Sequence, residues 1–262
     1  MLQALAYLIT FFACMVGTLS GMGGGIIIKP VLDATGQMSV AAVTFLSGVT
    51  VILMTVWTLG KTIKSRESVL DLRNTTLLAV SAAAGGLFGK QAYSAAEGLF
   101  PDPDMAGGVQ AALLLAATIG TFLYTLCKDR VRTKKISSVA AILLIGLLLG
   151  ALGSFMGIGG GPFNVAVLYY FFSMDTKTAT QNSLLIVLFS QLSSVLKTTV
   201  SGSIPEFPLV ILLGMIAAGI LGSEAGRRIY RKADEHQATV LFEGAMVLVM
   251  LVSAYNIYNF WT

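Results

Sequence analysis

Charged residues are scarce in this sequence. Lys, Arg, Asp and Glu make up 11% of its 262 residues, whereas 55% are hydrophobic. A soluble domain carries about 25% charged residues, because its surface faces water. No polar stretch is long enough to form a separate soluble domain. Lipid must therefore surround most of the surface, and we expect the whole chain to be a multi-pass membrane protein.

The residues that build most catalytic and metal sites are also scarce. The only histidine, His236, lies in a charged loop, and the two cysteines, Cys14 and Cys127, form no metal-binding spacing and no disulfide framework. No Ser-His-Asp set and no pair of intramembrane aspartates is present, so we predict neither an enzyme nor a cofactor. No carboxylate lies in the middle of an apolar run. This absence disfavours a fixed acidic proton carrier and favours an anionic substrate.

Eight apolar runs account for most of the chain. Most contain about 20 residues, the length at which a helix crosses the hydrocarbon of a bilayer. The first and fifth are longer, and a glycine cluster interrupts each of them. The first run has no features of a cleaved signal peptide, so we expect it to be retained. The runs are 4–33, 39–60, 74–95, 107–127, 138–172, 177–200, 207–228 and 238–261.

The two interrupted runs begin related halves. The cluster 157–161 follows the cluster 21–25 by 136 positions, and several polar residues repeat at the same offset. After a one-residue insertion, the Gly-x-x-x-Gly pair at 85–89 corresponds to the pair at 222–226. Composition alone would not align lysine, threonine, serine and tyrosine in this way, so we infer an internal duplication. The polar matches include Thr44 with Thr180, Ser47 with Ser183, Lys61 with Lys197 and Tyr93 with Tyr230.

The placement of charge indicates how the halves are oriented. The chain has a net charge of +4, and its basic residues cluster at 61–73, 128–135 and 227–232, between apolar runs. This is the pattern of cytoplasmic loops rather than of a nucleic-acid site. All three clusters lie on one side only if each glycine-broken run enters and leaves the membrane on the same side. Each half then has three full spans, so the halves are inverted and both termini lie outside.

The glycine clusters are candidates for a binding site. Glycine permits sharp turns, and its bare amides can surround an anion at the N-terminus of the following helix. Broken helices at equivalent positions of two halves are the best sequence indication of a transport site. Close helix packing is the alternative, and we favour it for the pairs 85–89 and 222–226. The candidate tip residues are Gly23, Gly24, Gly25, Gly159, Gly160, Gly161 and Asn164.

Polar residues also recur at helical spacing in the spans that follow each break. Such residues are costly in hydrocarbon unless they face a partner or water, so we expect them to line a cavity. Ser and Thr can instead bond to the backbone of their own helix. The candidates here are Thr44, Ser47, Thr180, Gln181, Asn182, Ser183 and Gln191. Lys61 and Lys197, near the helix ends, either attract an anion at each mouth or extend to the membrane interface.

These motifs resemble those of the sulfite exporter TauE/SafE family, also called the toluene sulfonate uptake permease family. The resemblance extends from Gly17 to about Tyr258 and is most specific at 157–162 and 180–183. It implies secondary transport of sulfite, sulfonates or sulfoacetate across a bacterial cytoplasmic (inner) membrane. The first half departs from this pattern, with Ile26 in place of Pro162. We therefore expect an asymmetric site.

The sequence thus predicts an all-α integral membrane protein of two inverted repeats, each a re-entrant broken helix plus three transmembrane helices. Residues 1–127 form the first repeat, 128–137 a basic cytoplasmic linker and 138–262 the second repeat. We predict a secondary transporter of sulfite or organosulfonates, such as sulfoacetate or taurine-type compounds, working by alternating access. A passive anion channel or a non-transporting membrane subunit remain alternatives. The expected partners are a small anion and the lipid bilayer, not nucleic acid, and a coupling ion or proton is left open.

Overall fold

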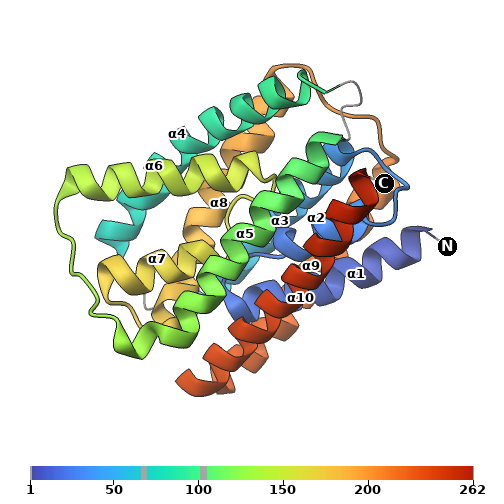
Figure 1. Ribbon diagram of the computed structural model, residues 1–262. Helices are drawn as coiled ribbons and strands as arrows, with labels where there is room; N and C mark the ends of the chain where they lie inside the picture. The colour runs from blue at the N-terminus through green and yellow to red at the C-terminus, as the bar shows by residue number, and fades with distance from the viewer. Residues whose placement is uncertain (1, 66–69, 101–104, 262) are drawn as a thin grey trace.

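The computed structural model describes residues 2–65, 70–100 and 105–261, and within those ranges the chain contains helices and no strands (Figure 1). The first half contains α1 (Leu2–Ser20), α2 (Gly25–Asp33), α3 (Val40–Lys64), α4 (Leu72–Glu97) and α5 (Met105–Cys127), followed by the short 3₁₀ helix η1 (Lys128–Arg130). The second half contains α6 (Val139–Phe155), α7 (Pro162–Phe172), α8 (Thr176–Val200), α9 (Leu209–Lys232) and α10 (Glu235–Trp261).

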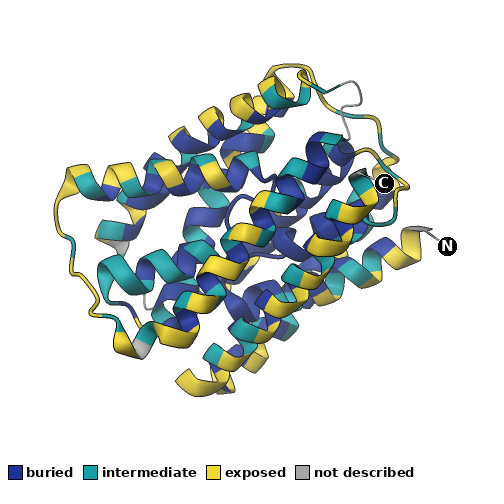
Figure 2. Cartoon of the chain, in the orientation of Figure 1, coloured by how far each residue is buried: buried dark blue, intermediate teal, exposed yellow. Residues whose placement is uncertain are grey.

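The helices have the lengths and surfaces of membrane spans. Among the described residues, α1, α3, α5, α8, α9 and α10 are long and apolar enough to cross a bilayer. Large apolar side chains such as Leu144, Leu221 and Leu251 are more than half exposed on the outer faces, where Figure 2 shows exposed residues on the outward side of the bundle. Exposure of so much apolar surface to water would be energetically unfavourable, so these faces contact lipid. The predicted all-α integral membrane fold is confirmed.

Each glycine-broken run folds into a hairpin. In Figure 1, α1 runs inward from the N-terminus and α2 returns toward the same side, and α6 and α7 do the same from the opposite side. Two hydrogen bonds join the open end of the second hairpin, where the chain enters α6 and leaves α7. The N–H groups of Lys134 and Ile136 donate to the carbonyls of Tyr170 and Phe171 at 2.7 and 3.0 Å. The glycine clusters therefore form the innermost points of the two hairpins, and we refer to them as the first tip (21–25) and the second tip (157–161).

The two halves pack in a reciprocal way. Helix α1 packs along α9 as α6 packs along α4, and α3 contacts α9 as α8 contacts α4. The pairs α3 with α8 and α5 with α10 each join a helix to its own counterpart. Exchanging the halves thus reproduces the main contacts, as expected for a duplicated unit. The inversion of the halves across a membrane stays a prediction.

Small residues allow the closest helix contacts. Cβ atoms placed on Gly85 and Gly89 of α4 would lie 2.0 and 2.1 Å from backbone oxygens of α6, and Cβ atoms on Gly222 and Gly226 of α9 would lie 2.1 and 2.4 Å from backbone oxygens of α1. No side chain fits at such distances. The packing role predicted for these four glycines is confirmed.

The described residues of the three basic clusters lie at one end of the bundle. The C-terminal ends of α3 and α9 meet the start of α8. Lys128 of η1, directly after α5, donates hydrogen bonds to Thr176 and Thr239 at 3.2 and 3.0 Å. Part of the basic stretch 61–73, residues 66–69, is outside the described residues. Both ends of the chain lie at the opposite end of the bundle in Figure 1, which is the arrangement that the charge pattern predicts.

Candidate functional site

The backbone of the two tips follows one pattern up to its third position. Gly21 and Gly157 have φ of 71°, and Gly23 and Gly159 have φ of 75° and 69°. Side chains other than glycine rarely adopt these values, so alternate positions require glycine. The tips then diverge. Gly24 is already helical, whereas Gly161 is extended and Pro162 begins α7, as the differing flanks Ile26 and Pro162 led us to expect.

The two tips meet in the interior. A Cβ placed on Gly25 would lie 3.5 Å from the carbonyl oxygen of Ile158 and 3.5 Å from Nε2 of Gln191. A Cβ on Gly23 would lie 3.1 and 3.7 Å from Val187 and Val51, which are equivalent positions of α8 and α3. The hairpins and the polar helices α3 and α8 thus converge on one small region.

Several backbone N–H groups at the tips are not used by the fold. Ile158 and Gly159 donate to the carbonyl of Gly153 at 3.1 and 2.9 Å, and Gly23 donates to that of Gly17 at 3.2 Å. Among the described hydrogen bonds, none has the N–H group of a glycine at 24–25 or 160–161 as its donor. Donors at the N-terminus of a helix are suited to an anion, since the helix dipole also favours negative charge there.

Two buried amide side chains at the second tip have polar atoms without partners. Asn164, in the first turn of α7, is 0% exposed, and neither its Oδ1 nor its Nδ2 makes a hydrogen bond. Gln191 of α8 is 2% exposed, and its Nε2 has no partner. Their side chains lie where Cβ atoms on Gly160 and Gly159 would fall, at 2.5 and 2.2 Å. Because an unsatisfied buried polar atom costs about 1 to 3 kcal/mol, three of them in one place indicate a site for a polar ligand.

The hydroxyl candidates have mixed roles. Thr44 donates to the carbonyl of Val40 and Ser47 donates to that of Thr44, both within α3. Ser183 instead reaches the first tip and donates to the carbonyl of Gly21 at 2.7 Å. The backbone and methyl group of Thr180 lie against the same glycine. Thr44 and Ser47 are thus satisfied by their own helix, whereas Ser183 and Thr180 position the first tip.

Asn182 does not face the tips. Its Oδ1 accepts from the N–H of Asp71 at 3.0 Å and from Oγ1 of Thr75 at 2.5 Å, and its Nδ2 donates to the carbonyl of Thr178. The amide therefore fastens the start of α4 to α8. Its neighbour Gln181 points to the other side of α8 and lines a cavity near the basic residues.

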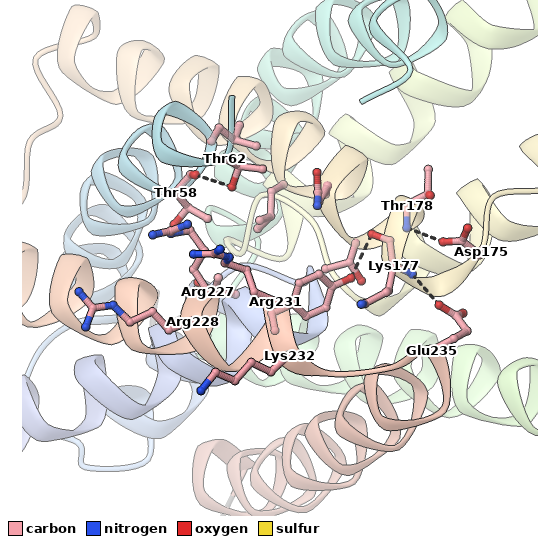
Figure 3. Close-up of a pocket in the computed structure, with 16 residues that line it drawn as sticks. Thr58, Thr62, Asp175, Lys177, Thr178, Arg227, Arg228, Arg231, Lys232 and Glu235 are labelled. Atoms are coloured by element: carbon pink, nitrogen blue, oxygen red, sulfur yellow. Dashed lines mark hydrogen bonds between the residues drawn. The ribbon is translucent and has the colours of Figure 1, made fainter. Parts of the chain in front are cut away.

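A basic vestibule opens between the tips and the charged end of the bundle (Figure 3). This cavity of about 850 Å³ is lined by the end of α3, the start of α8 and the end of α9. Thr180 lies on its wall, so the vestibule extends to the layer of the first tip. Its charged residues are Lys177, Arg227, Arg228, Arg231 and Lys232, with Asp175 and Glu235.

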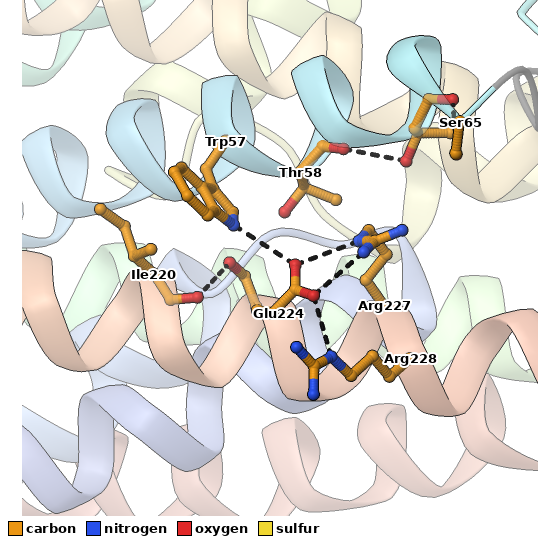
Figure 4. Close-up of polar contacts among 9 residues, drawn as sticks. Trp57, Thr58, Ser65, Ile220, Glu224, Arg227 and Arg228 are labelled. Carbon is orange, nitrogen blue, oxygen red and sulfur yellow. Dashed lines mark hydrogen bonds and ion pairs between the residues drawn. The ribbon is translucent and has the colours of Figure 1, made fainter.

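A carboxylate orients part of this basic surface. Glu224 forms ion pairs with Arg227 and Arg228 at 3.0 and 2.9 Å and accepts a hydrogen bond from Nε1 of Trp57 at 3.4 Å (Figure 4). The contact with Trp57 joins α9 to α3 across the vestibule wall. A concave surface with more basic than acidic groups concentrates anions near its floor.

A second vestibule of about 420 Å³ lies on the opposite side of the tips. Its lining repeats that of the basic vestibule at the offsets of the internal duplication. Thr44, Phe45, Ser194 and Thr198 correspond to Thr180, Gln181, Thr58 and Thr62, and Lys90, Gln91 and Ser94 correspond to Arg227, Arg228 and Arg231. The two cavities are thus lined by corresponding positions of the two halves, differ in size and charge, and are separated by the layer of the tips.

The two predicted mouth lysines are not equivalent. Lys197 is exposed and lines the second vestibule. Lys61 is also exposed, but its Nζ lies 4.8 Å from the ring centroid of Trp57, and it lines neither vestibule. The basic vestibule takes its charge from α9 instead, through residues that sequence reasoning assigned only to a cytoplasmic loop.

Sequence reasoning also missed a buried ion pair. Lys29 and Asp33 of α2 are 3% and 4% exposed, and Nζ lies 2.5 Å from Oδ2. The sequence has no carboxylate in the middle of an apolar run, but Asp33 at the end of the first run is nevertheless buried. One feature of the sequence could have predicted this pair. A lysine stands four residues before an aspartate within an apolar run, where a charged residue indicates a functional site.

Comparison with known proteins fits this architecture. The family model described as sulfite exporter TauE/SafE matches residues 6–255, which is nearly the whole chain. The chain belongs to the sulfite exporter TauE/SafE family. No curated protein and no solved structure gives a match. Membership in the TauE/SafE family makes this chain a multi-pass membrane transporter of a small anion of the sulfite type.

Proposed function

We propose that this chain is a secondary transporter of small sulfur-containing anions, sulfite or organosulfonates such as sulfoacetate or taurine-type compounds, in a bacterial cytoplasmic membrane. The observation that carries the proposal is the pair of buried amides, Asn164 and Gln191, whose polar atoms lack partners where the tips converge. A sulfo group offers three acceptor oxygens. Amide and backbone N–H donors directed at such a group form charge-assisted hydrogen bonds.

The two vestibules support a mechanism of alternating access. The anion enters through the larger basic vestibule or the smaller second vestibule, and the tips between them hold it. The vestibules are lined by equivalent residues of the two halves. If each half adopted the conformation of the other, one vestibule would therefore open and the other vestibule would close. We propose on this basis that residues 1–127 and 138–262 act as inverted repeats.

A binding screen tests the substrate class. Purified protein in detergent is heated with sulfite, sulfate, taurine, sulfoacetate or an aryl sulfonate, and thermal unfolding is recorded. We expect at least one sulfonate or sulfite to raise the unfolding temperature, because a ligand that binds only the folded state stabilises it. If none of them does, the proposed substrate class is wrong.

Transport itself is tested in liposomes by substrate counterflow. Gly160→Leu fills the space next to Asn164 and Val187 and is expected to abolish flux. Gly120→Leu is the matched control, because a Cβ at Gly120 meets nothing within 4 Å. A saturable counterflow in wild type that Gly160→Leu abolishes supports the proposal. Single-channel conductance would instead identify a passive channel, and neither binding nor flux would identify a non-transporting subunit.

A further inference from the structure

The ion pair between Lys29 and Asp33 is unusual for its position. Among the described residues these are the only buried charged side chains. Both lie in α2, a helix of nine residues that begins at the first tip, so Asp33 is about 12 Å along the helix from Gly25. Charges in such a place carry a large desolvation cost, and an apolar pair would often be equally stable or more so. The order, lysine before aspartate, is also the less favourable one for a helix. Stability therefore does not explain the pair.

Lys29 contacts the second tip. Helical side chains lean toward the N-terminus, so the stem of Lys29 extends back toward the tips. Its Cε lies 2.8 Å from the point where a Cβ on Gly157 would fall, and Cγ2 of Thr44 lies 3.1 Å from the same point. The helix that begins at the first tip thus places a cation against the second tip.

The charge is present in only one half. The positions equivalent to Lys29 and Asp33 in α7 are Val165 and Tyr169. The second half contributes instead the uncharged amides of Asn164 and Gln191, which lack partners. A cation from one half and neutral donors from the other converge on the same tip, which is a suitable arrangement for one anionic group.

We propose that the Lys29–Asp33 pair is the coupling element of the transport site: Lys29 supplies the positive charge for the anion, and Asp33 takes up one proton for each anion bound. This inference rests on the proposed anion transport. When the anion approaches Lys29, the carboxylate of Asp33 loses part of its compensating charge. A buried carboxylate in that position takes a proton from the aqueous phase, since an uncompensated charge is costly there.

The charge balance is complete for a monoanion. The empty site contains one positive and one negative group, and the loaded site contains the same groups plus an anion and a proton, so its net charge does not change. Anion and proton then cross the membrane in the same direction, and both are released on the other side. For a dianion the same step moves one net negative charge.

Few other ionisable groups face the pair. Helix α1 carries no Asp, Glu, Lys, Arg or His, and the charged residues of α3 and of the described part of α10 lie at their far ends, in 61–64 and 235–243. The face of α10 next to α2 contributes Asn256, whose Nδ2 donates to the carbonyl of Pro30 at 2.8 Å. Lys90 of α4 interacts electrostatically with Lys29. A second cation near Lys29 favours an anion and leaves Asp33 as the carboxylate that can take the proton.

The test uses full-length protein in liposomes that contain a pH-sensitive dye. Sulfoacetate and p-toluenesulfonate are the probes, because neither exchanges protons near neutral pH. In wild type we expect internal acidification during uptake, and accumulation driven by a pH gradient. Asp33→Asn should retain counterflow and lose both the acidification and the gradient-driven accumulation. Lys29→Met should weaken binding by about 10- to 150-fold, the effect of one hydrogen bond to a charged group.

Controls keep the outcome unambiguous. Glu206→Gln and Lys64→Met change exposed charges at opposite ends of the bundle and should behave as wild type in every assay. The double variant Lys29→Met, Asp33→Leu removes both charges together, so it should fold and yet bind the anion as weakly as Lys29→Met. The inference is overturned if wild type shows counterflow without proton movement, or if Asp33→Asn still acidifies the lumen. No counterflow in wild type would refute the proposed transport instead.

Discussion

Replacing Asn164 by leucine should stabilise the empty protein and weaken anion binding. The substitution keeps the number and branching of the side-chain heavy atoms and removes two buried polar atoms that have no partner. Each such atom costs about 1 to 3 kcal/mol, so removal of both should raise the free energy of unfolding without anion by about 2 to 6 kcal/mol. Most substitutions of buried polar residues destabilise a protein, and this unusual sign makes the test specific.

The loss of binding can be estimated from the same geometry. If Asn164 donates one hydrogen bond to a sulfo oxygen, its loss costs about 1.5 to 3 kcal/mol. The dissociation constant should then rise by roughly 10- to 150-fold. Thermal unfolding in detergent, recorded over a series of anion concentrations, measures both effects in one experiment.

A second asparagine provides the contrast. Asn182 is buried in the same half, but all of its polar groups bond to the protein, including the start of α4. Asn182→Leu should lower the free energy of unfolding by about 1 to 3 kcal/mol, because its partners become unsatisfied. The reasoning is refuted if Asn164→Leu also destabilises the empty protein and leaves the anion-induced shift intact, since Asn164 would then be a structural residue.

Three further substitutions test the tips, the helix contacts and the basic vestibule. Gly159→Ala should abolish counterflow, because its Cβ would lie 2.2 Å from Gln191, whereas Gly36→Ala, also at positive φ but in open space, should preserve it. Gly150→Leu should lower the free energy of unfolding by about 2 to 3 kcal/mol, since a Cβ there would lie 1.9 Å from a backbone oxygen of α4; an unchanged unfolding temperature would contradict the packing. Arg227→Gln should slow uptake severalfold at low salt and much less at high salt, and equal slowing at both would argue against electrostatic attraction.

Much of the fold could be predicted because the features that determine each helix lie within a single segment of the sequence. Apolar length identified the helices to within a few residues; α4, for example, begins at Leu72 and ends at Glu97, against a predicted run of 74–95. The Gly-x-x-x-Gly pairs indicated close contacts, since only a missing side chain permits them. Glycine clusters and basic residues likewise indicated where the chain turns and which ends of the helices lie together.

The candidate site could be predicted only in part. Gln191 and Asn182 have the same donor and acceptor groups and lie on the same helix, and no pattern in the sequence separates them. Asn182 is used by α4, more than 100 residues away in the chain, while Gln191 faces the second tip with its Nε2 free. The hydrogen-bond partner of a buried amide depends on which helix packs beside it.

The sequence by itself determined that this chain is a membrane protein with two glycine-broken halves, because hydropathy, glycine and charge act within a single segment. Tertiary structure alone decided how the halves share one site. It placed Lys29 of the first half against the tip of the second, and it made the basic residues at the end of α9 part of the wall of a vestibule. These features arise from contacts between distant segments, where burial sets the energy of each charge and each unpaired amide.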